Sequence, residues 1–182
     1  MTARPSSLGG PNWDETQLVI AELANLRAEI VKLTELQFQT TAATVLAFGT
    51  IVSVELQQHN VSIILIYPAL SLILGMIWLH YSNLIARIAT YIRDRIEDRV
   101  GHHNLGWEHY VKSHPLRGGK LIYWGIRPIF VISSVLALAA SLSVAALDIE
   151  TILLYSVAAV IAVVTLIIFI VWKEPSPELD SS

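Results

Sequence analysis

Residues 152–172 read ILLYSVAAVIAVVTLIIFIVW and carry no charged side chain between Glu150 and Lys173. A helix rises about 1.5 Å per residue, so a run of this length crosses the roughly 30 Å hydrocarbon core of a bilayer. Inside that core each backbone polar group needs a partner within its own segment, which makes a helix the structure expected for such a run. This stretch therefore predicts a transmembrane helix.

Three further stretches lack formal charges over a similar length, namely residues 36–54, 61–80 and 128–147. With their ends included, the four predicted spans cover about residues 36–56, 61–81, 122–147 and 152–172. The connections at 57–60 and 148–151 are very short, so the spans that they join form antiparallel hairpins. We therefore expect an all-α, polytopic membrane protein, with a transmembrane domain of four helices in two hairpins over residues 36–172.

The composition excludes several other classes of protein. Only 15% of the 182 residues are charged, against about 25% in a typical soluble domain. The net charge of −3 argues against a strongly basic nucleic-acid binder. The chain has no cysteine, which excludes disulfides, thiolate catalysis and cysteine-ligated zinc or iron–sulfur centres. We expect membrane lipids as the surroundings, no nucleic-acid partner and no cofactor.

The distribution of basic residues predicts the orientation in the membrane. Of the twelve Lys and Arg residues, eleven precede the first span, lie between the second and third spans, or follow the fourth, and Arg127 directly precedes the uncharged stretch 128–147 of the third span. The positive-inside rule therefore places both termini and the segment 82–121 in the cytoplasm of a multi-pass cell-membrane protein. Aromatic residues such as Trp78, Tyr123 and Trp172 lie at the predicted inner interface, where amphipathic rings anchor helix ends.

Residues 14–35 predict a cytoplasmic amphipathic helix that precedes the first span. Five of its apolar residues recur at alternating spacings of four and three, the heptad pattern of a coiled coil. This heptad seam consists of Val19, Leu23, Leu26, Ile30 and Leu33. Two interpretations stay open: the seam joins copies of the chain in a homo-oligomer, or it packs on the protein's own second cytoplasmic helix. The flanking residues 1–13 and the acidic tail 173–182 are expected to be disordered.

The seam continues into the first span as polar residues, which suggests a pore. The predicted lumen residues are Gln37, Thr40, Thr41 and Thr44. An external mouth formed by Glu55, Asp148 and Glu150 carries no basic residue and favours cations. Hydroxyl and small residues in a membrane helix also mark helix–helix contacts, as in the pair Gly49-x-x-x-Ser53, so packing is the alternative interpretation.

Residues 102–120, within the cytoplasmic segment 82–121, contain the only concentrated ionisable chemistry of the sequence. Apolar residues at helical spacing extend the second helix to Gly101, which is expected to end it. Four histidines nearby are the candidate metal ligands: His102, His103, His109 and His114. Their spacing matches no metal-binding motif, so we expect no metal site.

No enzyme is predicted, because the spans contain no paired ionisable groups and the chain contains no nucleophile elbow, P-loop or dinucleotide loop. Two functions remain. One is an oligomeric, cation-permeable channel lined by the first transmembrane helix. The alternative is a membrane-anchored adaptor or effector subunit whose cytoplasmic helices bind a protein partner through Arg93, Arg99 and Trp107.

Two short segments carry a resemblance to a known group of proteins: Tyr91-Ile92-Arg93-Asp94 and Leu105-Gly106-Trp107-Glu108. Together with the hairpin layout, they resemble small uncharacterised bacterial four-span integral membrane proteins. The resemblance implies a bacterial membrane protein and assigns no functional residues. Some bacterial membrane proteins of this size act as permeability effectors in defence against phage, which is an analogy of architecture.

Overall fold

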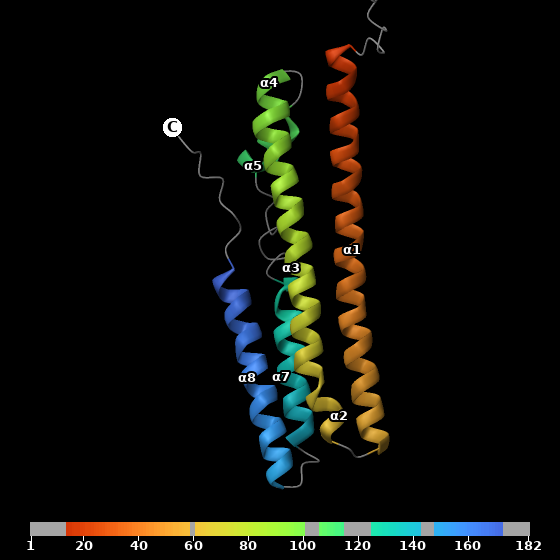
Figure 1. The fold of residues 1–182 in the computed structure, drawn as a ribbon, viewed down its shortest axis with the longest axis vertical. Helices are drawn as coiled ribbons and strands as arrows, with labels where there is room; N and C mark the ends of the chain where they lie inside the picture. Colours follow the sequence, from red (N-terminus) through yellow and green to blue (C-terminus); the bar gives the residue numbers. More distant parts are fainter. Residues whose placement is uncertain (1–13, 59–60, 101–105, 115–124, 143–147, 173–182) are drawn as a thin grey trace, which may run out of the picture.

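The computed structural model describes residues 14–58, 61–100, 106–114, 125–142 and 148–172, and all regular secondary structure in these ranges is helical. The first helix, α1, spans Glu15–Gln58 without a break (Figure 1). Asp14 caps it, because its Oδ1 accepts a hydrogen bond from the Thr16 N–H at 3.4 Å. The amphipathic segment and the first apolar run predicted from sequence thus belong to one helix of 44 residues.

The second apolar run forms a broken helix that continues past the apolar residues. Its parts are α2 (Val61–Leu65), α3 (Tyr67–Tyr91), a π-helical turn η1 (Ile92–Glu97) and α4 (Asp98–Val100). The break falls at Ile66, just before Pro68, which has no N–H to donate to the preceding turn and therefore sits in the first turn of a new helix. From Tyr67 to Val100 the helix is continuous, which agrees with the predicted extension of the second helix as far as Gly101.

Three further helices complete the described fold: α5 (Trp107–Ser113), α7 (Pro128–Leu142) and α8 (Ile149–Val171). Asp148 caps α8 through a 2.8 Å hydrogen bond from the Ile149 N–H to its Oδ1. Successive long helices run in opposite directions, so the start of α1 and the ends of α4 and α8 point to the same end of the molecule (Figure 1).

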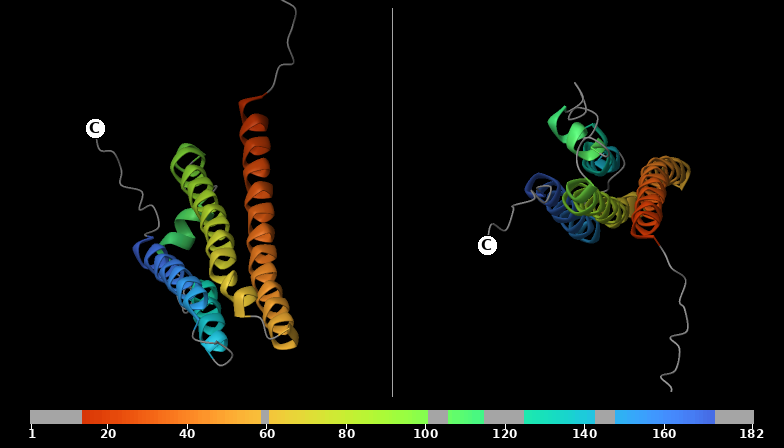
Figure 2. Two further views of the ribbon diagram at one scale, coloured as in Figure 1. Left: turned by 60° about the horizontal axis from the view of Figure 1, so that its bottom comes forward. Right: turned by 90° about the horizontal axis from the view of Figure 1, so that it is seen from above.

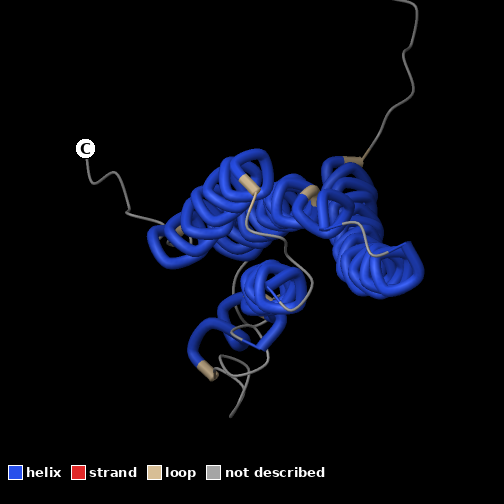
Figure 3. Tube along the Cα trace, turned by 90° about the horizontal axis from the view of Figure 1, so that it is seen from below, coloured by secondary structure: helices blue, strands red, loops and turns tan. Residues whose placement is uncertain are grey.

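The central element is α3, which packs against α1, α7 and α8 (Figure 2). One core cluster joins Trp78 and Leu79 of α3 to Phe130 of α7 and Phe169 of α8. Gly75 permits this close packing, since a Cβ there would lie only 2.9 Å from the Phe169 ring. A second cluster joins Ile64, Tyr67 and Ala137, with Phe48 and Ile51 of α1 packed against it. From the end of the bundle, α7 lies to one side of the row formed by α1, α3 and α8 (Figure 3).

Three helical segments are long and apolar enough to cross a membrane: Thr16–Gln58, Ser62–Val100 and Ile149–Val171. The fourth apolar helix, Pro128–Leu142, has 15 residues, which give about 22 Å of helix and fall short of the roughly 30 Å core. The remainder of the predicted third span, at 122–124 and 143–147, lies outside the described residues. The structure therefore supports an all-helical protein with three membrane-length helices.

Two helices extend beyond the rest of the bundle at one end. Figure 1 shows α1 and the rod formed by α3, η1 and α4 continuing side by side past the end of α8. We call this part the stalk and define it as residues 15–35 together with residues 84–100. It carries most of the charged side chains of these helices.

Candidate functional site

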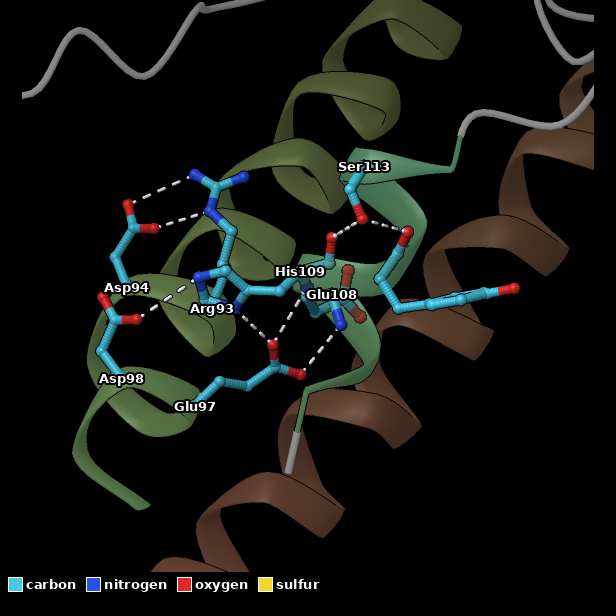
Figure 4. A network of polar contacts seen from close by, with 8 residues as sticks. Arg93, Asp94, Glu97, Asp98, Glu108, His109 and Ser113 are labelled. Carbon is cyan, nitrogen blue, oxygen red and sulfur yellow. Dashed lines mark hydrogen bonds and ion pairs between the residues drawn. The ribbon is translucent and has the colours of Figure 1, made fainter. Parts of the chain in front are cut away.

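The candidate site is built around a buried carboxylate in the stalk. Glu97, the last residue of η1, is 0% exposed. Its Oε1 accepts a hydrogen bond from the Glu108 N–H at 2.9 Å, and its Oε2 accepts one from the His109 N–H at 3.1 Å. His109 Nδ1 lies 2.8 Å from the same Oε2 (Figure 4). One side chain of the stalk therefore holds the beginning of α5.

The position of Glu97 explains how a helix as short as α5 is held in place. The residue before α5 is Gly106, which has no side chain to accept hydrogen bonds from the first N–H groups of the helix. Glu97 supplies that acceptor from another element, and its negative charge suits the positive end of the helix dipole. The capping residue, Glu97, thus lies eleven residues before Glu108 in the sequence.

The hydrogen bonds decide the ionisation of Glu97. Burial raises the pKa of its carboxyl, but the hydrogen bonds from Glu108 and His109 and the charge of His109 outweigh burial, so the pKa lies below its usual value. Glu97 is thus ionised at neutral pH. The neighbouring Glu108 shows the opposite shift: burial and the charge of Glu97 raise its pKa, although Arg27 and Arg93 oppose this.

His109 lies between two carboxylates. Its Nδ1 faces Glu97, and its Nε2 lies 3.3 Å from Oδ1 of Asp98, the first residue of α4 (Figure 4). A neutral imidazole can donate through one nitrogen only, whereas the protonated ring donates through both. Each ring nitrogen of His109 therefore lies next to a carboxylate of the stalk.

The π-helical turn positions these groups. An α-helix has 3.6 residues per turn, and the wider π turn changes the phase of the residues that follow it. The buried residues of η1 are Ile92, Ile96 and Glu97. Asp98, which follows η1, is exposed and lies directly beside His109. π-Helical turns of this kind are frequent at functional sites.

The outward side of α5 is an aromatic surface. Trp107, Tyr110 and Val111 are 57%, 56% and 42% exposed. The Tyr110 ring stacks on His114 with centroids 4.4 Å apart, and on Trp107 with centroids 6.3 Å apart. We call these four residues the α5 face. The helix is anchored on one side by Glu97 and presents large, ordered rings on the other.

A groove lies between the two helices of the stalk. Its volume is about 720 Å³, and its lining includes Val19 and Glu22 of α1 with Tyr91, Arg95 and Arg99 of the facing rod. The Tyr91 hydroxyl donates a 2.7 Å hydrogen bond to Glu22, which raises the pKa of that tyrosine. The lining mixes both signs of charge.

The three residues predicted to bind a partner all lie on or beside the stalk. Trp107 belongs to the α5 face, and Arg99 lines the groove. Arg93 is mostly buried and holds Asp94, with Nε 2.7 Å from Oδ1 (Figure 4). The structure thus brings Arg93 and Trp107 to the same part of the stalk.

The heptad seam faces the protein's own second rod. Leu33 is 7% exposed, and the other four seam residues are half-buried, whereas most residues between them are exposed. Helix α1 packs against α3 and η1 along this side. The arrangement corresponds to the intramolecular interpretation of the seam.

The predicted lumen residues continue the same side of α1. Thr40 and Thr44 are buried, and their hydroxyls donate to the carbonyls of Leu36 and Thr40. Gln37 Nε2 donates to the Trp78 carbonyl of α3 at 3.4 Å. The hydroxyl of the half-buried Thr41 donates to the Gln37 carbonyl. Within one chain, Gln37, Thr40 and Thr44 therefore point into the contact between α1 and α3.

The three predicted mouth residues have different surroundings. Glu55 is 1% exposed, and its buried Oε1 has no hydrogen-bond partner. Asp148 and Glu150 are exposed at the start of α8, where Asp148 serves as the cap. Glu55 is inward-facing because it follows Ile51 by four residues, one helical turn further along the buried side.

The histidines that were candidate metal ligands have other contacts or lie outside the described residues. His102 and His103 belong to the latter group. His109 is held by Glu97 and Asp98, and His114 stacks on Tyr110 with its Nδ1 2.9 Å from the Ser113 hydroxyl. Among the residues that the structure describes, no group of three or more His, Asp or Glu side chains is arranged to hold a metal ion.

No family model matches the sequence, and no curated protein or solved structure shows significant similarity to it. The resemblance to small bacterial four-span proteins stays a prediction.

Proposed function

We propose that this chain is a four-span integral membrane protein acting as an adaptor or effector subunit, not as an enzyme. The α5 face is its docking surface for a cytoplasmic protein. The observation that carries this proposal is the anchoring of α5 by buried Glu97 while Trp107, Tyr110 and Val111 stay exposed. Tryptophan and tyrosine dominate binding energy at protein interfaces. Rings that are already ordered lose little conformational freedom on binding.

The placement of the stalk in the cytoplasm rests on charge. The stalk contains Arg87, Arg93, Arg95 and Arg99, and it lies at the same end of the molecule as the end of α8. The positive-inside rule assigns this end to the cytoplasm. Glu55, Asp148 and Glu150 then belong to the outer end.

Cysteine labelling tests this orientation, since the chain has no cysteine of its own. Lys112→Cys on α5 is expected to react in intact cells only with membrane-permeant thiol reagents. Gln57→Cys, at the exposed end of α1, is the matched control and reacts with impermeant reagents as well. The reverse pattern contradicts the orientation.

Site-specific photo-crosslinking tests the docking surface. A photoreactive amino acid at Val111 is expected to give one discrete protein adduct in cells, because Val111 lies on the α5 face. The same group at Glu29, an exposed position on α1, serves as the control. Trp107→Ala should abolish the adduct. Adducts with lipid alone, or equal adducts from both positions, contradict the adaptor function.

A cation-permeable pore is the second candidate function. The observation that favours it is the set of polar side chains buried in the bundle, including Thr44, Ser71, Ser134 and, toward the outer end, Glu55. We place this function second because these hydroxyls donate to backbone carbonyls within the packed helices. A lumen along them requires α1 to separate from α3.

Thiol accessibility separates the two candidates. In a water-filled lumen, Thr44→Cys reacts with small water-soluble thiol reagents, because thiolate formation needs water. The modification then changes ion flux in proteoliposomes. In the packed arrangement of the structure, Thr44→Cys stays unreactive, while the exposed Gln57→Cys reacts in the same sample.

A further inference from the structure

The side of α1 that faces away from α3 carries a second apolar pattern. Ten exposed residues recur along it at spacings of three and four, with one omission at the half-exposed Val52. We call them the outer strip: Ala21, Ala24, Ala28, Val31, Glu35, Phe38, Ala42, Val45, Gly49 and Leu56. All except Glu35 are apolar or small. Val31 and Phe38 are 69% and 66% exposed.

Lipid accounts for only part of the outer strip. The predicted span begins at residue 36, so Ala21, Ala24, Ala28 and Val31 belong to the stalk, beyond the hydrocarbon core. Ile20, beside them, is also 61% exposed. An apolar strip that continues from the membrane into water, with Glu35 as its single charged residue, marks a protein-interaction surface.

The membrane half of the outer strip has a shape suited to another helix. A shallow hollow of about 390 Å³ lies at Val45 and Gly49 of the strip, and its other lining residues are Leu46, Thr50, Ser53 and Val54. Apart from its chain neighbours and the backbone of its own helix, no atom lies within 4 Å of the position that a Cβ would take at Gly49. Small residues such as Ala42 and Gly49 let two helix backbones approach closely.

A second copy of the same chain satisfies the constraints on the partner. Copies inserted in one orientation lie parallel and at equal depth, so each residue of the outer strip meets its own counterpart. Spacings of three and four over residues 21–56 suit a parallel coiled coil. In a coiled coil, four positions of each heptad contact the partner helix. Over residues 21–56 these positions comprise about 20 residues in each copy, which is within the range of stable protein–protein interfaces. The single charge, Glu35, is paired with Lys32 of the same chain at 3.0 Å.

We propose that this protein forms a parallel dimer through the outer strip of α1, with Gly49 against Gly49 of the second copy. This differs from assembly through the heptad seam, which lies on the opposite side of the helix and packs on α3. The proposal rests on the membrane insertion proposed above. It does not depend on the α5 face.

Disulfide cross-linking of single cysteines in native membranes tests the dimer. Val31→Cys, Phe38→Cys and Val45→Cys are expected to give a covalent dimer on mild oxidation, because paired strip positions bring Cα atoms within disulfide range. Thr40→Cys, buried against α3, is the inward control. Val163→Cys, 53% exposed on α8, measures random collisions. Equal dimer from Val163→Cys, no dimer at the strip positions, or adducts of another mass overturn the proposal.

Gly49→Leu provides the decisive variant. The structure leaves open space at this position, and leucine has a higher helix propensity than glycine, so the single chain folds normally. The added side chain keeps the two backbones apart. We expect loss of the Val45→Cys dimer and a protein mass in nanodiscs that falls to that of one 20.1 kDa chain. An unchanged dimer overturns the proposal. Resistance of the same sample to alkaline extraction establishes membrane insertion separately.

Discussion

Glu97 of η1 and His109 of α5 are joined twice: Oε2 of Glu97 accepts from the His109 N–H at 3.1 Å and lies 2.8 Å from its Nδ1. The carboxylate of Glu97 is fully buried. Because His109 belongs to α5, these contacts exist only while α5 lies against the stalk. The attachment of α5, and with it the orientation of the aromatic face, therefore depends on Glu97 together with the contact between His109 and Asp98.

Glu97→Ala should detach α5. Each hydrogen bond to a charged acceptor contributes about 1.5–3 kcal/mol, so loss of three such bonds costs about 4.5 kcal/mol or more. Hydrogen-exchange mass spectrometry is expected to show faster exchange of the amides in residues 107–113 and unchanged exchange in α8. Asp94→Asn, which removes the negative charge of a partly exposed ion pair, is the control and leaves α5 protected. Unchanged protection of α5 in Glu97→Ala contradicts this role.

Glu108→Gln should strengthen the attachment of α5 at neutral pH. Burial and the charge of Glu97 raise the pKa of Glu108 above its ordinary 4.5. A raised carboxyl pKa means that the ionised form is less favourable in the folded protein. The attachment is therefore weakened above that pKa and unaffected below about 4.5. We expect slower exchange of α5 amides in Glu108→Gln than in wild type at pH 7, and no difference at pH 4. A variant that exchanges faster at pH 7 contradicts the sign.

Gly75→Ala should destabilise the bundle. Its Cβ would lie 2.9 Å from the Phe169 ring, which is itself stacked on Phe130 and has little room to move. Overpacking of this kind costs about 1–3 kcal/mol. Gly125→Ala, where nothing lies within 4 Å, is the matched control and should change stability by less than about 0.5 kcal/mol. Unfolding of the purified protein in detergent, followed by tryptophan fluorescence, measures both variants.

The helices could be predicted from the sequence because their signals are local. Long uncharged runs mark the apolar helices, and Asp14 and Asp148 occupy the capping positions. The inward side of α1 could also be predicted, since Leu26, Ile30 and Leu33 repeat at helical spacing. The buried side continues through Thr44 and Ile51 to Glu55, so the same spacing contained the signal for the burial of Glu55. Its position at the end of a span suggested an exposed mouth residue instead.

The candidate site depends on contacts that no local pattern indicates. Helical spacing places Glu97 among the charged residues of the second helix, and the π turn changes that phase. Its partner, α5, follows residues 101–105 in the sequence. The sequence shows only that Gly106, which has no side chain, precedes this short helix, so the first N–H groups of α5 need an acceptor from another residue. A glycine at the capping position supplies no side-chain acceptor, and this is a sequence signal for a cap from elsewhere.

The double variant Leu26→Asp with Ile30→Asp should open the stalk without separating copies of the chain. Both residues pack toward the second rod in the same chain, and placing carboxylates there costs several kcal/mol unless the groups move into water. We expect faster amide exchange in residues 15–35 and 84–100, together with loss of the Tyr91–Glu22 contact. The outer strip is unaltered, so the mass of the complex in nanodiscs stays the same. Asn25→Asp, an added charge at an exposed position of α1, is the control. A smaller complex with a fully protected stalk would show that the heptad seam joins two copies.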